Sequence, residues 1–152
     1  MNYKRANLEI CKDIINGELI RAQKSENEMY LFVDPEGHYG YFINKKDVAF
    51  SMDKVREFSK ETRNITKLEA IKPENEIKPT KFLRIIDFCG KRLAQKFEAE
   101  GKEVWIQRDF LKNLDINATK FYQEKENKLE TVVAVEDGVP VMCLLPFKII
   151  DS

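Results

Sequence analysis

The pair Asp137-Gly138 constrains this chain most, because it separates two apolar, β-branched runs. Residues 131–136 (TVVAVE) precede it and residues 139–150 (VPVMCLLPFKII) follow it. A two-residue type I′ turn needs positive φ at both central positions, so an Asp-Gly pair predicts a β-hairpin here. The second run is apolar on both faces, which predicts a strand covered on both sides. Pro140 and Pro146 cannot donate ladder hydrogen bonds, so we expect one edge of this strand to be free or bulged.

This hairpin ends a longer stretch, residues 103–150, whose pattern predicts the order β-α-β-β-β. Residues 104–106 form a short apolar run that is typical of a strand. In residues 108–114 the apolar side chains recur at helical spacing, which predicts one short helix. Residues 119–124 alternate between polar and apolar side chains and predict a second strand.

The N-terminal half predicts helices and strands in alternation. Apolar residues at helical spacing indicate a first helix over residues 3–22. Residues 29–33 and 39–43 predict a hairpin around the turn at residues 34–38, where Pro and Gly favour the turn conformation. The remaining elements expected in this half are a helix over residues 45–60 and a strand over residues 64–71.

A basic helix is predicted after a linker at residues 72–78. It would run from about residue 81 to residue 100, with Thr80 as its N-cap and Gly101 ending it. At helical spacing, one face is apolar and the opposite face is rich in cations. The apolar face comprises Phe82, Ile86, Cys89, Leu93 and Phe97, and the basic face comprises Lys78, Lys81, Arg84, Lys91, Arg92 and Lys96. Such a basic face can lie along a phosphate backbone, but a solvated face whose lysines pair with acids elsewhere explains it better.

The two halves of the chain, residues 1–76 and 77–152, have a similar order of expected elements. Phe42-Ile43 and Trp105-Ile106 occupy equivalent positions, each before a predicted short helix. We therefore expect an internal duplication within one domain spanning residues 1–152. The predicted fold class is α+β, with two β-α-β-β-β-like units and an antiparallel sheet packed on helices.

Composition excludes several classes of function. The 152 residues include 26 basic and 26 acidic side chains, so the net charge favours neither nucleic acid nor membrane, and a nucleic-acid role needs a local patch. The first 11 residues lack a signal-peptide core and no apolar run reaches membrane-spanning length, so we expect a cytoplasmic protein. Cys11, Cys89 and Cys143 are each set in an apolar pattern, which favours buried free thiols.

No motif for catalysis, metal binding or a cofactor is present, so we expect no enzyme activity, no metal and no cofactor. The sequence contains no P-loop, dinucleotide fingerprint or zinc-protease motif. His38, the single histidine, alternates with Asp34 and Glu36 in a turn-forming segment. That spacing allows a metal or acid–base site, but a simple turn explains it better.

The hairpin at residues 29–43 is dense in aromatic side chains, and two interpretations are open. Aromatic side chains on an exposed sheet can stack nucleic-acid bases. They also fill the space between a sheet and its helices, which is the interpretation we favour. The side chains concerned are Tyr30, Phe32, Tyr39, Tyr41 and Phe42.

Two short patterns carry a resemblance to known families. Lys45-Lys46-Asp47-Val48 and Arg108-Asp109-Phe110-Leu111, each following an apolar strand, resemble the openings of the β-α-β-β-β units of DNA sliding clamps. The tail at residues 136–149 (EDGVPVMCLLPFKI) is similar to the "ENG-x-x-V-G-x-x-x-P-x-x-I" tails of small proteins carried by phages and integrative elements of low-GC Gram-positive bacteria. The resemblance implies a clamp-like fold. Because the chain is neutral and the short helix carries Asp109 and Asp115, the resemblance does not imply clamp function.

These observations lead to two main functional hypotheses, and an enzyme that uses His38 is a third and weaker one. The first is a non-catalytic accessory protein of a phage or mobile element that binds DNA, or a replication or transcription protein, through the basic helix. Its nucleic-acid contacts would be Lys81, Arg84, Lys91, Arg92 and Lys96. The alternative is a protein-interaction or inhibitor module that acts, without nucleic acid, through the sheet edge near Pro146 or by pairing with its own copy.

Overall fold

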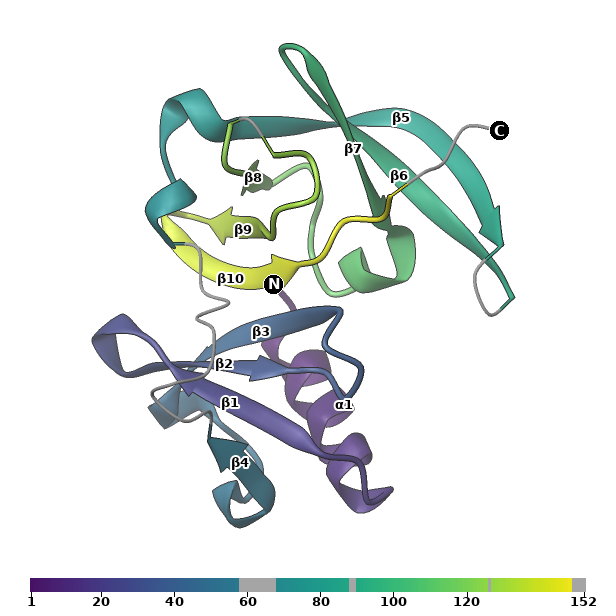
Figure 1. Ribbon diagram of the computed structural model, residues 1–152. Coiled ribbons are helices and arrows are strands. Elements are labelled where there is room, and N and C mark those ends of the chain that lie inside the picture. Colours follow the sequence, from purple (N-terminus) through teal and green to yellow (C-terminus); the bar gives the residue numbers. More distant parts are fainter. Residues whose placement is uncertain (58–67, 88–89, 126, 149–152) are drawn as a thin grey trace.

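The computed structural model describes residues 1–57, 68–87, 90–125 and 127–148, and Figure 1 shows their arrangement. Within these residues there is one α-helix, one ten-stranded sheet and several 3-10 turns. The elements are α1 (Tyr3–Ile15), β1 (Ile20–Lys24), β2 (Met29–Val33), β3 (Tyr39–Asn44), β4 (Val55–Glu57), β5 (Glu76–Asp87), β6 (Lys91–Ala99), β7 (Lys102–Gln107), β8 (Thr119–Tyr122), β9 (Val132–Glu136) and β10 (Val139–Leu144).

The sheet runs in the order β4-β1-β2-β3-β10-β9-β8-β5-β6-β7. Strands β1 and β4 pair in parallel and the other neighbours pair antiparallel. Beyond β10 the chain returns to β7, where Phe147 N donates a hydrogen bond of 2.7 Å to Trp105 O. The strands from β10 round to β7 therefore curve back on themselves in the upper half of Figure 1.

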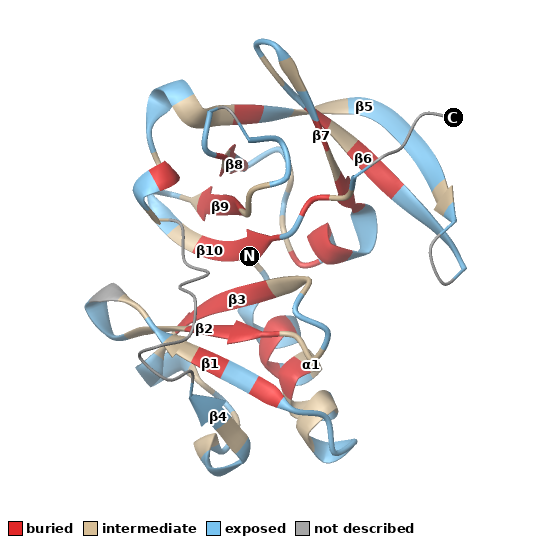
Figure 2. Cartoon of the chain, in the orientation of Figure 1, coloured by how far each residue is buried: buried red, intermediate tan, exposed pale blue. Residues whose placement is uncertain are grey.

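The core lies on both faces of the central strands (Figure 2). On one face α1 contributes Ala6 and Ile10, which join a large cluster with Phe32 and Tyr41 from the hairpin. On the other face a smaller cluster includes Leu31, Phe42 and Cys143, with Leu68 and Ile71 packed against it. The aromatic hairpin supplies buried side chains to both clusters, so the core-packing interpretation of these aromatics is confirmed.

The C-terminal hairpin forms as its sequence predicts. Asp137 and Gly138 have φ of 50° and 77°, the positive values that a type I′ turn requires. Strand β10 is covered on both faces, with Met142 in one cluster and Cys143 in the other. The register shifts just after Pro140, which confirms the expected bulge.

The prediction of a sheet edge near Pro146 is wrong. Strand β10 lies between β3 and β9 and pairs with both. Pro146 follows β10 and is buried before the bridge at Phe147. The outer strands of the sheet are β4 and β7 instead, because β3 and β9 occupy both hydrogen-bonding edges of β10.

The prediction of a basic helix over residues 81–100 is also wrong. The segment forms the antiparallel strands β5 and β6, which turn at Gly90 with φ of 109°. Phe82, Ile85 and Ile86 belong to the aromatic and β-branched types that favour strands. The pairing of β5 with β6, and of residues 94–99 of β6 with β7, satisfies much of the backbone of this segment, so tertiary contacts override its helical spacing.

The other predicted helices are shorter than expected or absent. Helix α1 ends at Ile15 instead of residue 22, because Gly17 takes φ of 78° and the chain then enters β1. Residues 45–57 form 3-10 turns at Lys45–Asp47 and Met52–Lys54 and the strand β4, and residues 58–60 lie outside the described part. The expected helix at residues 108–114 is a 3-10 turn at Arg108–Leu111. The expected strand at residues 64–71 begins outside the described part and contains a 3-10 turn at Leu68–Ala70.

The fold class is therefore corrected from α+β with helices packed on a sheet to mostly β. Helices packed on the sheet as in a clamp are not seen in the described residues, where α1 alone is α-helical. Both halves do contain a three-stranded meander, β1–β2–β3 or β5–β6–β7, followed directly by a 3-10 turn. The duplication stays a prediction, and the pairing of β3 with β10 joins the two halves.

Gly40 has no room for a side chain at the centre of this sheet. A Cβ at this position would lie 2.8 Å from Leu31 Cδ1 and 3.0 Å from the carbonyl oxygen of Phe32. We expect Gly40→Ala to lower the free energy of unfolding by about 1–3 kcal/mol, and Gly40→Val by more, because a packed core resists added volume. Urea denaturation measures both, and a Gly40→Val variant as stable as the parent would contradict this packing.

Candidate nucleic-acid interface

The predicted DNA-contacting residues lie on and beside a two-stranded projection formed by β5 and β6. The pairing of β6 with β7 ends at Ala94, and the pairing of β5 with β8 is limited to Glu76 and Ile77. Residues 82–87 and 91–95 are here called the ribbon, and its residues 82–87 and 91–93 extend past the neighbouring strands. Figure 1 shows the ribbon projecting at the right of the molecule, and Figure 2 shows that its far end is exposed.

The register of the ribbon assigns its side chains to two faces, because residues opposite one another share a face. Arg84 lies opposite Ala94 and Ile86 opposite Arg92, so both arginines lie on one face, here called the arginine face. On the other face, here called the apolar face, Ile85 lies opposite Leu93. Lys91 belongs to the apolar face opposite Asp87, and Lys81 is exposed in the irregular part of β5 before the ribbon.

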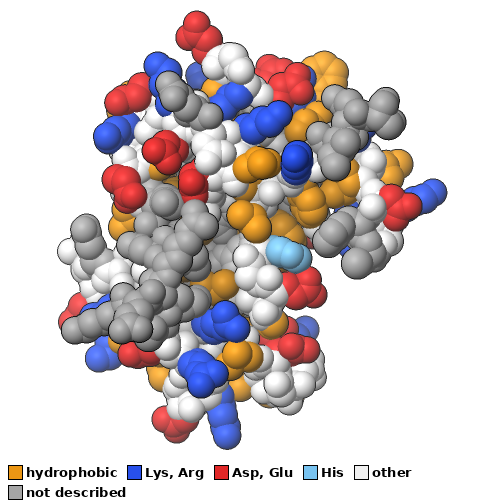
Figure 3. Space-filling view, in the orientation of Figure 1, with side chains coloured by type: hydrophobic (Ala, Val, Ile, Leu, Met, Phe, Trp, Pro, Cys, Tyr) orange, Lys and Arg blue, Asp and Glu red, His pale blue; other side chains and the backbone are white. Residues whose placement is uncertain are grey.

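The ribbon exposes an unusual amount of apolar surface. Phe82 is 64% exposed and Ile85 is 65% exposed, and Leu83 and Leu93 are each 44% exposed. In Figure 3, hydrophobic side chains gather over the part of the molecule that carries β6 and β7, with cations and acids among them. Apolar side chains left in water on a projecting element are typical of a binding surface.

Lys96 differs from the other four predicted contact residues. Its ammonium lies 2.9 Å from Glu98 Oε1, 3.1 Å from Glu103 Oε1 and 5.1 Å from the centre of the Phe82 ring. Hydrogen bonds to Glu98 and Glu103 raise the pKa of Lys96. The geometry gives Lys96 a supporting role at the base of the ribbon, where it orients Phe82.

An open cleft of about 590 Å³ lies beside the base of the ribbon. Arg84 lines it from β5 and Trp105 from β7, and Phe147 lines it where the chain returns to β7. The other residues that line it include Lys102, Lys128 and Lys148 and the acids Glu98 and Glu103. Sequence reasoning missed this cleft, because its residues come from segments that are far apart in the chain.

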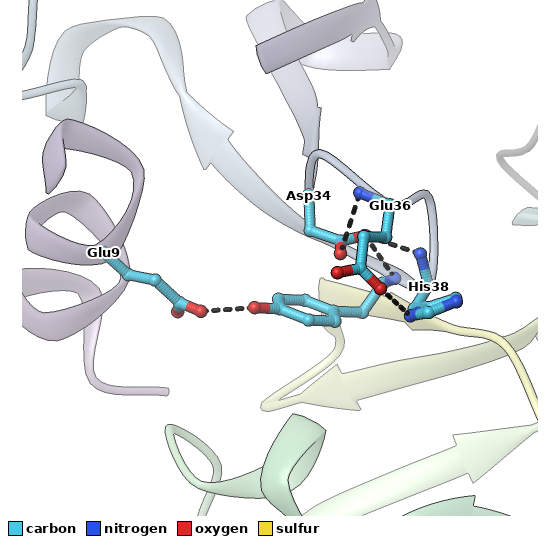
Figure 4. Close-up of polar contacts among 5 residues, drawn as sticks. Glu9, Asp34, Glu36 and His38 are labelled. Carbon is cyan, nitrogen blue, oxygen red and sulfur yellow. Dashed lines mark hydrogen bonds and ion pairs between the residues drawn. The ribbon is translucent and has the colours of Figure 1, made fainter. Parts of the chain in front are cut away.

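The turn that holds His38 is built around Asp34 (Figure 4). The Asp34 carboxylate accepts hydrogen bonds from the backbone N–H groups of Glu36, His38 and Tyr39, while burial raises its pKa. His38 Nδ1 lies 3.5 Å from Glu36 Oε2, and the imidazole stacks on Phe110 at 5.7 Å between ring centres. These contacts fit a structural turn, and no group of three potential metal ligands occurs in the described residues.

Glu9 connects α1 to the aromatic hairpin. Its carboxylate accepts hydrogen bonds from the hydroxyl groups of Tyr39 and Tyr41, and Figure 4 shows the side chain of Glu9 extending from the helix toward the hairpin. Asn113 Nδ2 also donates to the Tyr41 hydroxyl, at 2.9 Å. Burial, followed by the bond to Glu9, raises the pKa of both tyrosines. This network stabilises the core rather than forming an open site.

The cysteines do not form an obvious reactive site. Cys143 is a buried thiol, as predicted, and Cys11 is only half-buried, so the expectation of burial is wrong for Cys11. Cys89 lies outside the described residues.

Comparison of this chain with protein-family models, with curated proteins and with solved structures finds no match. No helix in the described part of the chain is long and apolar enough to cross a membrane.

Proposed function

We propose that this protein is a non-catalytic nucleic-acid-binding protein that uses the ribbon as its contact element. The observation that carries the proposal is the arginine face, where Arg84 and Arg92 lie close together on a strand pair that projects from the sheet. A two-stranded β-ribbon fits the major groove of DNA, and arginine is the common donor to phosphates and to guanine.

Local charge supports this proposal although the whole chain is neutral. Residues 78–98 contain six cations, namely Lys78, Lys81, Arg84, Lys91, Arg92 and Lys96, and two acids, Asp87 and Glu98. The exposed Phe82 stands next to Arg84 in β5. Cations that neutralise phosphates, with apolar groups that touch bases or sugars, are the usual composition of such surfaces.

The biological setting follows from the resemblance described above. The tail at residues 136–149 and the two strand-end patterns are similar to short segments of mobile-element and clamp proteins. We therefore place the protein in the cytoplasm as an accessory factor of a phage or mobile element, acting on DNA during replication or transcription.

Fluorescence polarisation with labelled DNA at about 50 and 200 mM salt tests this function. If about four phosphates are contacted, affinity should fall about 100-fold between the two salt concentrations, because each contact releases counterions. The double variant Arg84→Glu/Arg92→Glu should bind at least about 10-fold more weakly at low salt and show a shallower salt dependence.

The matched control is Lys45→Glu/Lys46→Glu, which makes the same change in charge at two exposed lysines of the N-terminal half. It should retain most of the binding, and circular dichroism should show both variants folded. Absence of binding at low salt, or equal losses in the two double variants, would overturn the proposal.

A protein-binding function is the second candidate, and the apolar face of the ribbon favours it. Leu83, Ile85 and Leu93 are three exposed aliphatic side chains on the ribbon. Such a surface suits a protein partner or a second copy of the chain, in place of the sheet edge near Pro146. Binding of this kind strengthens or stays constant as salt rises, so the salt titration separates the two candidates.

A further inference from the structure

The cleft beside the ribbon combines aromatic and cationic groups. Trp105 of β7 and Phe147, which forms a β-bridge with it, both line the cleft. Trp105 is only partly buried. The cleft's volume of about 590 Å³ falls within the range of about 300–1,000 Å³ that is usual for ligand sites. An aromatic wall that water reaches provides a surface on which a flat ring can stack.

Among the described residues that line this cleft, cations outnumber acids. Arg84, Lys102, Lys128 and Lys148 line it, against Glu98 and Glu103. Both of these acids are engaged by the ammonium of Lys96, at 2.9 and 3.1 Å. A ligand in the cleft therefore meets cations whose charge the lining acids only partly offset, which selects for an anionic group.

Lys102 is the most constrained of these cations. Its ammonium donates a hydrogen bond of 2.9 Å to the carbonyl oxygen of Glu124, which positions the side chain at the cleft. Burial lowers the pKa of Lys102. An anion close to this ammonium would offset the free-energy cost of burying its charge. This position therefore favours a bound anion.

We propose that the cleft binds one unpaired nucleotide of a single-stranded nucleic acid, with its base stacked on Trp105 and its phosphates among Arg84, Lys102 and Lys148. This inference rests on the proposed nucleic-acid function and extends it to the form of the substrate. Arg84 lines the cleft and also belongs to the arginine face, so the backbone of the strand can pass from the ribbon into the cleft. Duplex DNA keeps its bases paired and cannot insert one without unstacking it.

Trp105 is the single tryptophan of the chain, so intrinsic fluorescence reports directly on the cleft. Titration with an oligothymidine of about 16 nucleotides, a length that covers the site sizes of single-strand binders, should quench this fluorescence. The quenching should follow the same curve as the polarisation signal. A duplex of equal length should give a polarisation change at low salt without quenching.

Two sets of variants complete the test. Trp105→Ala should weaken binding of the oligothymidine about 10-fold, and Trp105→Phe should restore most of it, because a phenyl ring also stacks. Lys128→Glu/Lys148→Glu should weaken single-strand binding about 10-fold, while Lys45→Glu/Lys46→Glu should leave it nearly unchanged.

The outcomes separate this inference from the proposed function. Polarisation binding without tryptophan quenching, or equal affinity for single strand and duplex, would overturn the cleft inference and leave the ribbon proposal standing. Absence of binding to either DNA would overturn both. Quenching that is lost in Lys128→Glu/Lys148→Glu would support the inference independently of the folding of any Trp105 variant.

Discussion

Replacing Phe97 by alanine should lower the free energy of unfolding by about 3–5 kcal/mol, the usual cost of removing a buried phenyl ring. Phe97 is 0% exposed at the base of the ribbon, and its ring packs edge-to-face on Phe121 at 4.8 Å between centres. Little of the cavity can close, because Val104 lies opposite Phe97 in the sheet and is itself buried. Urea denaturation followed by circular dichroism measures the change.

Leu93→Ala is the matched control for Phe97→Ala. Leu93 lies four residues before Phe97 on the same strand and the same face, but it is 44% exposed. We expect it to cost less than about 1 kcal/mol, because little buried contact is lost. In a helix over residues 81–100, both side chains would share one buried face, so similar large losses in the two variants would contradict the ribbon.

Alkaline pH should destabilise the protein steeply above pH 10. The hydroxyl of Tyr41 is buried and donates to Glu9, so its pKa in the folded state is raised above the value near 10 of the unfolded chain. The stability that depends on this proton is fully present below pH 10 and is lost as the pH rises toward the folded-state pKa. The loss is about 1.4 kcal/mol per pH unit for one such group, and Tyr39 adds a loss in the same direction because its hydroxyl is also partly buried and donates to Glu9.

Urea denaturation at pH 8, 9, 10 and 11 measures this slope. Tyr41→Phe should be less stable than the parent at pH 8, by about 1–3 kcal/mol, because Glu9 and Asn113 lose a buried partner. Its stability should then fall less steeply above pH 10. Ile43→Val on the same face of β3 removes a methylene group without removing a titrating group, so its slope should match the parent. A Tyr41→Phe variant with the parent's slope would contradict this account.

Local sequence determined the elements whose geometry depends on few residues. The Asp137-Gly138 turn, the aromatic hairpin of β2 and β3 and the start of α1 all form where the sequence predicts them. In each case the signal lies within a short stretch, as a required φ, an alternation of side chains or a helical spacing near an N-cap. Strand β7 includes the expected residues 104–106, and strand β8 lies within the expected residues 119–124.

Tertiary structure decided the rest of the fold. Residues 81–100 have a helical spacing of apolar side chains, and the pairing of β5 with β6 and of β6 with β7 selected strands instead. This choice moved Lys91 to the apolar face and left Arg84 and Arg92 together on the other face of the ribbon. No periodicity within the segment contains that information, because it depends on which distant strands are available as neighbours.

The candidate site shows the same division between sequence and tertiary structure. The sequence alone identified the cations of residues 78–98 as the local charge excess in a neutral chain, and it identified His38 as part of a turn. The cleft forms where the chain returns from β10 to pair Phe147 with Trp105, and Lys102, Lys128 and Lys148 line it from three separate segments. Contacts between residues so far apart form only when the whole sheet closes, since the entropy of closing such long loops is offset by the complete core and not by local propensity.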